Sequence, residues 1–218
     1  MKKWIRLASV AGGLLGAVAT FSSVNATEGI YFGLMADRTA IGGDFKGTSG
    51  LVSPNDVILL PEIEQGLGLG FILGMKIGPS LGFEISYLSS DRDAVWRSIP
   101  FNVEYSVLNL DILYYLKSGI PVEVYGILGM AVPDILVKRG SVGNNSQIGD
   151  VTYSGIGFNF GAGLDYYLNK NFSLGARLVY HSVDYNYAEG IATEGSIKNE
   201  IGGSGIGLMV NAIYHIGK

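Results

Sequence analysis

The sequence predicts an all-β protein, an eight-stranded antiparallel up-and-down transmembrane β-barrel preceded by a cleavable signal peptide. Three observations predict it: apolar residues alternate over long segments, the connections alternate between long and short, and the chain opens like an export signal. A period of two indicates strands, because successive side chains point to opposite faces. One face is continuously apolar and the other mixes Gly with polar residues, which is typical of a strand between lipid and a polar lumen.

The first 26 residues have the features of a secretory signal peptide. Residues 2–6 hold three bases, residues 7–21 are a short apolar stretch, and residues 24–26 (Val-Asn-Ala) fit a small-x-small cleavage site. The alternative is a membrane-anchoring helix, but the apolar stretch falls short of the usual length of about 20 residues. We expect a signal peptide over 1–26 and one outer-membrane β-barrel domain over 27–218.

Composition excludes several classes of protein. The chain has no Cys, so disulfides, a lipoprotein anchor, thiol catalysis and Cys-ligated metal are excluded. Beyond the signal no uncharged apolar run is long enough for a membrane helix, so the 48% hydrophobic residues must be spread along strands. Without the three bases of residues 1–26, the chain carries 12 Lys and Arg against 19 Asp and Glu, a net charge of −7. This balance argues against nucleic-acid binding.

Eight segments show the strand alternation. They span roughly residues 29–37, 66–77, 81–89, 105–116, 122–132, 153–168, 172–187 and 203–216. Long connections (38–65, 90–104, 133–152 and 188–202) alternate with tight turns, as in a barrel with long outside loops and short periplasmic turns. An even strand number lets the last strand pair with the first, which removes unpaired edges that lipid could not satisfy. A soluble periplasmic sandwich is the alternative fold.

Two parts of the chain resemble a known group of proteins. Gly157-Phe-Asn-Phe-Gly-Ala-Gly-Leu-Asp-Tyr-Tyr-Leu and Phe172-Ser-Leu-Gly-Ala-Arg-Leu-Val-Tyr resemble the closing hairpin of the small outer-membrane β-barrel families, the OmpA/OmpX-like group. Val124-Tyr-Gly-Ile-Leu-Gly-Met-Ala-Val resembles their fifth strand. The resemblance implies a porin-type barrel in the cell outer membrane, with a carboxylate–arginine bridge closing the lumen. Unlike family members, the chain ends Tyr214-His-Ile-Gly-Lys218 instead of on an aromatic residue, and we expect no peptidoglycan-binding domain.

Parity along the strands places a set of charged side chains inside the barrel. The candidate lumen network is Lys76, Glu84, Asp111, Glu123, Asp165 and Arg177, with Asp37 and His181 also inward. A lumen of eight strands is filled by side chains or holds one small ligand, so we expect these charges to satisfy one another. The alternative is a gate, in which Glu84 and Arg177 exchange partners and admit ions. Inward Gly residues are expected to make room for Tyr115, Tyr125 and Tyr167.

No catalytic, cofactor or metal site is predicted. His181 and Ser182 are adjacent and therefore face opposite sides of a strand, and His215 faces inward near the periplasmic end. We therefore expect a structural or surface-interaction (adhesin-like) role with a plugged lumen. The alternatives are a narrow channel for ions or small solutes and a lipid-modifying enzyme.

The expected partners are outer-membrane lipids, the barrel-assembly machinery through the C-terminal strand, and a host or surface ligand through the long loops. We expect a monomer. The apolar run Val57–Pro61 is expected to pack across the barrel mouth, the alternative being contact with a host or phage surface. Two aromatic girdles are expected, Tyr114, Tyr166, Phe172 and Tyr214 near the turns and Tyr87, Trp96, Phe101, Tyr153 and Tyr180 toward the loops.

Overall fold

The computed structural model describes residues 28–53, 56–96, 98–116, 121–138, 150–190 and 193–217. The predicted signal peptide lies outside the described residues. The strands are β1 (Gly29–Thr39), β2 (Thr48–Ser53), β3 (Asp56–Leu60), β4 (Glu62–Ile63), β5 (Gly66–Ile77), β6 (Leu81–Trp96), β7 (Ile99–Leu116), β8 (Val122–Lys138), β9 (Val151–Asn169), β10 (Phe172–Gly190) and β11 (Thr193–Gly217). No helix in these ranges is long and apolar enough to cross a membrane.

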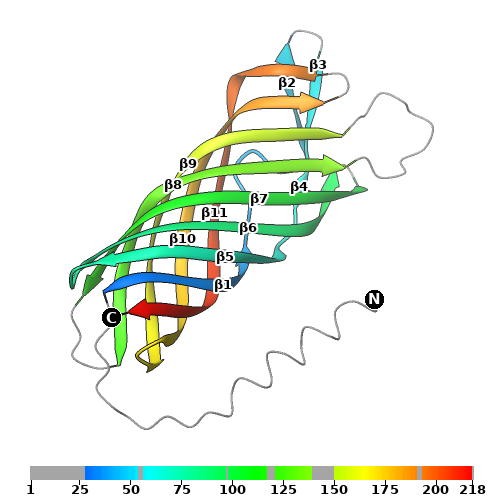
Figure 1. Cartoon of the computed structure of the whole chain (residues 1–218). Helices are drawn as coiled ribbons and strands as arrows, with labels where there is room; N and C mark the ends of the chain where they lie inside the picture. The colour runs from blue at the N-terminus through cyan, green and yellow to red at the C-terminus, as the bar shows by residue number, and fades with distance from the viewer. Residues whose placement is uncertain are drawn as a thin grey trace.

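Within the described ranges, eight long strands close into an antiparallel ring (Figure 1). The ring order is β5, β1, β11, β10, β9, β8, β7 and β6, and the pairing of β6 with β5 completes it. The first and last strands pair along the whole of β1, from Gly29 opposite Gly217 to Thr39 opposite Gly207. The predicted fold class is therefore confirmed, and each of the eight predicted segments lies in one of these strands.

The first long connection adds short strands that the sequence did not predict. β2 pairs with β3 as a separate hairpin, and β4 pairs with the distal part of β6. Between β1 and β2 the backbone continues to run along β11, because Ala40 N donates to Ile206 O at 3.0 Å and Gly42 N to Ser204 O at 2.8 Å. The ring thus extends beyond the end of β1 on this side.

The predicted long connections between β6 and β7, β8 and β9, and β10 and β11 are largely wrong. β6 continues to Trp96 and β7 begins at Ile99, so residues 90–104 are mostly strand. β10 continues to Gly190 and β11 begins at Thr193, which removes the predicted loop at 188–202. β8 reaches Lys138 and β9 begins at Val151, so the predicted loop at 133–152 is shortened, and its middle lies outside the described residues.

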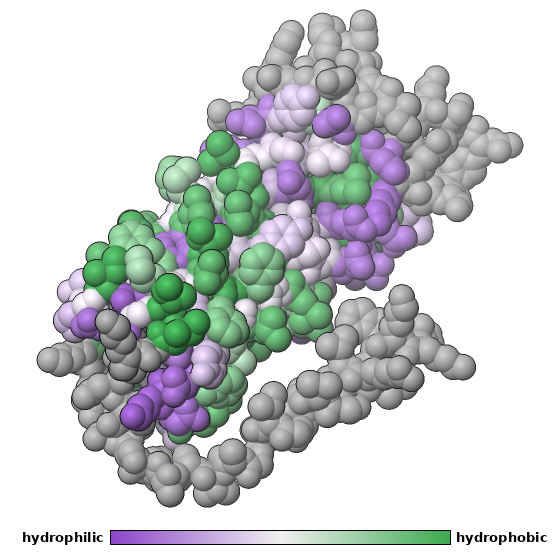
Figure 2. Space-filling model, viewed as in Figure 1, coloured by the Kyte–Doolittle hydropathy of each residue, from purple (hydrophilic) through white to green (hydrophobic). Residues whose placement is uncertain are grey.

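The prediction failed there because the apolar pattern changes faces partway along each strand. On β6, Phe83 and Tyr87 point outward, but the next outward residues include Asp91 and Asp93. On β7, the outward residue Leu110 is followed toward the far end by Glu104. Figure 2 shows hydrophobic residues gathered over the middle and lower left of the molecule and hydrophilic residues gathered toward the upper right, with further hydrophilic residues at the lower left end. We call the part with outward apolar side chains the membrane half and the part with outward polar side chains the protruding half.

The inner face changes in the opposite sense. The protruding half has inward apolar side chains that are almost fully buried: Ala94, Phe101, Val103, Ile135, Val137, Tyr153, Val183, Tyr185 and Ala188. Its outward residues are mostly polar: Asp91, Asp93, Asn102, Glu104, Asp134, Lys138, Ser154, Ser182 and Asp184. Such a pattern is that of a water-facing sheet with its own hydrophobic core. At the change of face the apolar alternation is interrupted, and the polar residues there resemble a loop in the sequence.

Three buried aromatic side chains meet inside the protruding half, and we call them the aromatic cap: Phe45, Tyr153 and Tyr185. Phe45 comes from the first connection and meets both tyrosines edge-on, with ring centroids 5.9 Å and 5.3 Å apart. Leu60 and Pro61 are buried as well, while their packing across the mouth stays a prediction. The side chains of residues 57–59 lie outside what the structure describes.

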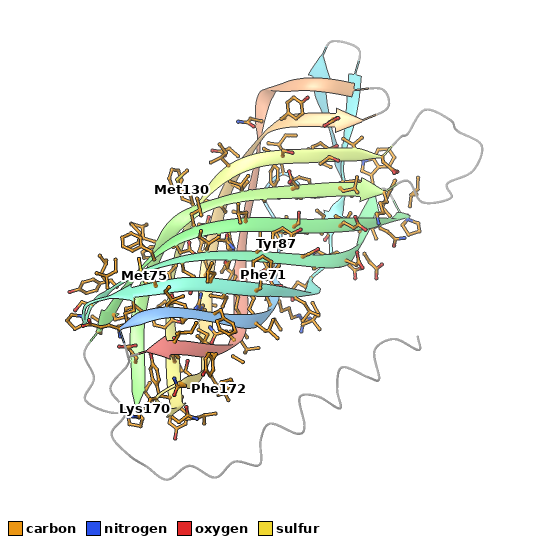
Figure 3. The ribbon with its side chains drawn as sticks, viewed as in Figure 1. Phe71, Met75, Tyr87, Met130, Lys170 and Phe172 are labelled. Atoms are coloured by element: carbon orange, nitrogen blue, oxygen red, sulfur yellow. The ribbon has the colours of Figure 1, made fainter. Side chains whose placement is uncertain are left out.

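The aromatic girdles are only partly as predicted. Tyr87 and Tyr180, as well as Tyr114 and Tyr214, point outward and are exposed. Tyr87 lies against Phe71 with ring centroids 5.8 Å apart, and Lys170 and Phe172 lie at the β9–β10 turn (Figure 3). The prediction that Phe101 and Tyr153 belong to the girdle toward the loops is wrong. Both occupy inward positions and are buried in the protruding half, where the apolar face is the inner one.

Candidate functional site: the charged lumen

The six predicted network residues all point into the barrel and are buried or nearly so. Relative exposure is 3% for Glu84 and 4% for Arg177, and the Glu123 side chain is the most open at 14%. Lys76, Asp111 and Asp165 are also buried. The structure brings four of the six together as two ion pairs, and places the other two beside them.

The first ion pair joins β6 to β10. Arg177 Nη2 donates to Glu84 Oε2 at 2.9 Å, and Arg177 Nη1 donates to the other carboxylate oxygen. This two-point contact is the strongest geometry for an arginine–carboxylate pair. Tyr31 Oη donates to Glu84 Oε2 at 3.0 Å, and Arg177 Nε donates to Tyr125 Oη at 2.9 Å. Both charges are therefore held by a second strand as well as by each other.

Asp165 is the neighbour of this pair, not a direct partner. Tyr125 Oη accepts from Arg177 and itself donates to Asp165 Oδ1 at 3.3 Å. One hydroxyl thus separates the guanidinium from a second carboxylate.

Asp111 belongs to a chain of amide hydrogen bonds in the middle of the lumen. Asn159 Nδ2 lies 2.9 Å from Asp111 Oδ1 and 3.0 Å from Asn109 Oδ1, and donates to both. His181 Nδ1 lies 2.7 Å from Asn159 Oδ1, and Asn109 Nδ2 donates to Ser86 Oγ at 3.2 Å. The chain links β10 to β6 through side chains of β9 and β7.

The second ion pair lies near the turns and joins Lys76 on β5 to Glu123 on β8. Tyr167 Oη donates to Glu123 Oε2 at 3.0 Å, and Lys76 Nζ lies 4.2 Å from the centre of the Tyr115 ring. A cation over an aromatic face gains electrostatic stabilisation in a desolvated site. Lys76 therefore has both an acidic and an aromatic partner.

Sequence reasoning missed several members of this network. Tyr31, Asn109 and Asn159 hold the predicted charges but were not singled out, although their inward parity was readable. A second missed contact is Ser173 Oγ, 2.9 Å from His215 Nε2. Both side chains are buried, at 0% and 6% exposure. No group of three or more His, Asp or Glu in the described ranges is placed to hold a metal ion.

The inward glycines shape the space around the tyrosines. A Cβ on Gly163 would lie 2.6 Å from the Tyr125 ring, and one on Gly82 would lie 2.8 Å from the Tyr115 ring. Both distances are too short for real atoms, so these strands pass the rings only because they carry no side chain. The expectation that inward Gly makes room for Tyr115 and Tyr125 is confirmed.

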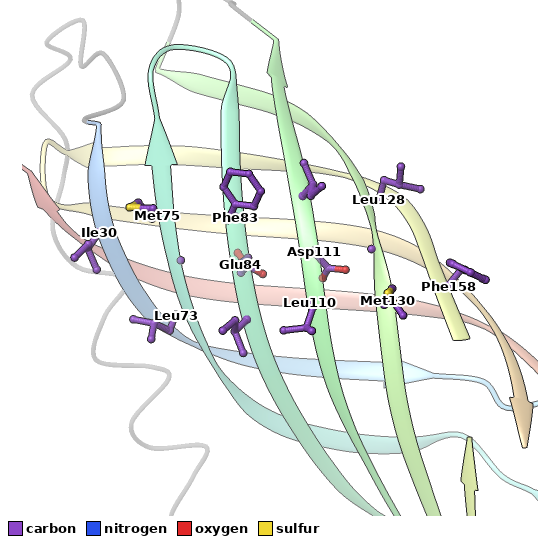
Figure 4. A pocket seen from close by; sticks show the side chains of 14 residues that line it. Ile30, Leu73, Met75, Phe83, Glu84, Leu110, Asp111, Leu128, Met130 and Phe158 are labelled. Atoms are coloured by element: carbon purple, nitrogen blue, oxygen red, sulfur yellow. The ribbon is translucent and has the colours of Figure 1, made fainter. Parts of the chain in front are cut away.

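A large hollow lies on the outer wall and not in the lumen (Figure 4). It runs across the strands between two rows of outward apolar side chains, one including Phe83 and Leu128 and the other including Leu110 and Phe158. Glu84 and Asp111 lie between the rows, and their carboxylates are buried on the inner side. The hollow is therefore a furrow in an apolar outer belt, where lipid chains make contact in a membrane.

A closed antiparallel ring with an apolar outer belt and a charged interior defines a transmembrane β-barrel. The sequence matches the family described as outer membrane protein beta-barrel domain over residues 8–213. The chain belongs to this family and is an outer-membrane protein in contact with the lipids of that membrane. No curated protein sequence matches it.

Solved structures of three outer-membrane proteins are similar to this chain. OprG from Pseudomonas aeruginosa is 16% identical with a TM-score of 0.59, covering 91% of this chain and 100% of OprG. Neisserial surface protein A is 15% identical with a TM-score of 0.56, covering 88% of this chain and 99% of its own. A major outer membrane protein from Thermus thermophilus is 16% identical with a TM-score of 0.50, covering 85% of this chain and 98% of its own. At such low identities these likenesses show the fold alone.

Proposed function

We propose that the protein is a plugged outer-membrane barrel with a structural and surface-interaction role. The observation that carries this proposal is the Glu84–Arg177 pair, held across the inside of an eight-stranded ring with side-chain exposures of 0% and 3%. A lumen of this size is narrow even before side chains fill it. Opening it would separate two buried, hydrogen-bonded charges, at a cost of about 3–5 kcal/mol if one partner is left alone.

The surface-interaction part rests on the protruding half, which we infer faces outside the cell. Its wall is built from hydrogen-bonded strands, with Asp91 paired opposite Glu104 and Asn102 opposite Lys138. The side chains on this wall are therefore presented by a fixed sheet and not by long flexible loops. A rigid polar wall with an internal hydrophobic core suits contact with a partner outside the membrane.

Conductance in planar lipid bilayers tests the plug. The purified protein is first shown to be folded by its shift in gel mobility between unboiled and boiled samples, because closed barrels resist detergent until heated. We expect the folded wild-type protein to insert without current steps. Regular steps from samples that show the mobility shift would overturn the plugged lumen.

Surface interaction is tested separately on whole cells. A variant that carries Asp91→Ala, Asn102→Ala and Lys138→Ala on the wall of the protruding half is compared with the wild type for adhesion to cultured cells. We expect weaker adhesion at equal amounts of folded protein in the outer membrane. A variant that adheres as well as the wild type would show that this wall does not take part in the interaction.

A gated channel is the second candidate, and the position of Tyr125 favours it. Its hydroxyl links Arg177 to Asp165, so the guanidinium could leave Glu84 for a second carboxylate. The lumen network holds four carboxyl groups and two bases, so an open form would favour cations over anions. Current steps from the wild type with a cation-selective reversal potential in a salt gradient would support this candidate over the plug.

Three further expectations accompany the proposal. Cleavage of a signal peptide after residue 26 predicts that N-terminal sequencing of the protein from outer membranes starts at Thr27.

Recognition of the C-terminal strand by the assembly machinery predicts that removing the aromatic ring of Tyr214 lowers the amount of heat-shifting protein in the membrane. A monomer predicts that chemical crosslinking in membranes gives one band.

No enzymatic role is proposed. Ser173 and His215 form the one serine–histidine contact described, and both lie inside the barrel wall with almost no exposed surface. A nucleophile and base need a substrate within hydrogen-bond reach. Lipid A mass spectrometry of a deletion strain tests this interpretation, and an altered acylation pattern restored by the wild-type gene would contradict it.

A further inference from the structure

A separate polar cluster lies in the protruding half, above the ion pairs already described. We call it the Arg92 cluster and define it as Asp37, Thr39, Ser90, Arg92 and Tyr105. Arg92 Nε donates to Ser90 Oγ at 2.8 Å, and Arg92 Nη1 donates to the backbone oxygen of Thr39 at 2.6 Å. The guanidinium carbon lies 4.6 Å from the centre of the Tyr105 ring. Residues from β1, β6 and β7 thus fix one charge inside the barrel.

The Arg92 cluster differs from the ion pairs below it in its electrostatic balance. Arg92 Nη2 donates no hydrogen bond within the described residues, although Arg92 is only 3% exposed. Asp37 instead accepts a hydrogen bond from the Thr39 hydroxyl. Burial lowers the pKa of Arg92 below its ordinary value. The guanidinium remains charged at neutral pH and is not neutralised by a direct ion pair.

A small void lies next to two members of the cluster, Thr39 and Tyr105. It is also lined by His181 and Tyr185, among others, and measures about 10 Å³. That volume holds one water at most. A hydrated ion needs more room than this void offers, and the buried guanidinium of Arg92 lies at the same level, on the other side of Thr39 and Tyr105. The aromatic cap lies in the same protruding half, where Tyr185 lines the void and packs on Phe45.

The Arg92 cluster and the Glu84–Arg177 pair are well separated. Glu84 and Arg92 are eight residues apart on β6, which is about 26 Å of strand at 3.3 Å per residue. Leu88 lies between them, inward and 1% exposed. No hydrogen bond or ion pair given for the described residues joins the Arg92 cluster to Glu84 or Arg177. Removing the Glu84–Arg177 pair therefore breaks none of the hydrogen bonds that hold Arg92 to Ser90 and Thr39.

We propose that the Arg92 cluster, with the aromatic cap above it, is a second barrier that closes the lumen independently of the Glu84–Arg177 pair. This inference rests on the proposed plugged barrel and assigns the closure to two levels. Opening the membrane half alone leaves an ion facing a buried guanidinium and a void of about one water. Both levels must change before the lumen conducts.

The test records bilayer conductance for a set of variants that pass the gel-mobility check. The first carries Glu84→Ala and Arg177→Ala together, so that neither charge is left unpaired. The second adds Arg92→Ala to these two, and the third also adds Phe45→Ala. The control adds Arg38→Ala instead, which removes an arginine from the outward, exposed face of β1 in the same part of the barrel.

We expect the Glu84→Ala/Arg177→Ala protein and the Arg38 control to give no current steps. Steps should appear, with conductance at least tenfold above the baseline noise, once Arg92→Ala is added, and should grow with Phe45→Ala. Current from the Glu84→Ala/Arg177→Ala protein alone would overturn the second barrier while leaving the wild-type plug intact. If no variant gave current steps, the assignment of the second barrier to Arg92 and Phe45 would be overturned. Current from the wild type would overturn the plug itself.

If the variants with Arg92→Ala fail the mobility check, Arg92→Gln provides a second route. Glutamine keeps a donor toward the Thr39 backbone oxygen and removes the charge. Added to Glu84→Ala/Arg177→Ala, it should give current steps smaller than those expected for Arg92→Ala. If the folded Arg92→Gln variant gave no current steps, the guanidinium charge would not be the barrier.

Discussion

The membrane half and the protruding half of this barrel are built from the same strands but are opposite in polarity. In the membrane half, Leu110 and Phe83 face outward while Asp111 and Glu84 face inward. In the protruding half, Asp93 and other polar side chains face outward, while residues such as Val103 fill the interior. The strand geometry is unchanged between the two halves. What changes is the medium outside, lipid in one half and water in the other.

The comparison shows that each half solves a different energetic problem. In the membrane half the outer face contacts lipid and is apolar. The polar side chains therefore lie in the lumen, where they must form hydrogen bonds or ion pairs with one another. In the protruding half, apolar burial is gained inside the barrel, as in a water-soluble sheet. The four predictions that follow test this division, beginning with the largest expected effect.

Breaking one ion pair in the membrane half should cost the most. Glu84→Ala should lower the free energy of unfolding by about 3–5 kcal/mol, because Arg177 is left charged and buried. Removing both side chains should cost less than either single change, since no unpaired charge remains. Urea unfolding in lipid vesicles measures this. Equal losses for Glu84→Ala and for Glu84→Ala/Arg177→Ala would show that the pair is not what stabilises the lumen.

The outer face should respond to charge only where lipid covers it. Leu110→Arg should cost about 2–4 kcal/mol, because it places a charge near the middle of the apolar belt. Ser182→Arg, outward on β10 beyond the belt, should cost little in the same unfolding assay. If both substitutions were equally costly, the boundary between the halves would lie higher on the barrel than we place it.

Packing around the lumenal tyrosines should be sensitive to a single methyl group. Gly74→Ala should cost about 1–3 kcal/mol, because the new Cβ would overlap the ring of Tyr31, which Glu84 holds in place. Gly126→Ala is the matched control, since its Cβ meets no atom within 4 Å. The urea midpoints of the two variants are compared, and that of Gly74→Ala should be the lower. Similar midpoints would mean that Tyr31 moves aside freely.

The smallest effect is expected on the outer wall of the protruding half. Lys138 pairs with Glu104, but both are about two-fifths exposed, and Lys138→Ala should leave the urea midpoint unchanged within error. Its hydrogen bond to Glu104 raises the pKa of Lys138 above its ordinary value. Any contribution is therefore present at neutral pH and is lost only as the pH rises through that raised value. A clear loss of stability at pH 7 would show that this wall is more ordered by its charges than we expect.

Much of the membrane half could be read from the sequence because its signal is local. The alternation from Ile156 to Leu164 shows both the strand and its lipid-facing side, and parity alone placed Glu84, Asp111 and Arg177 inside. The turns could be read from short polar breaks between such segments. Lipid imposes this pattern on nearly every outward residue, so each strand repeats the same evidence.

The protruding half and the partners inside the lumen were decided only by the tertiary structure. At Ser89 to Asp91 the apolar residues of β6 change from the outer to the inner face, because water instead of lipid now lies outside. The local sequence does not show that the strand continues past this change. Parity also places Arg177 inward without saying that its partner is Glu84, ninety-three residues away, and not Asp165. That choice depends on strand order and register, and so do the position of Arg92 opposite Thr39 and the entry of Phe45 into the mouth. The sequence by itself determined which medium each local face prefers, while ring closure determined which of the inward groups meet.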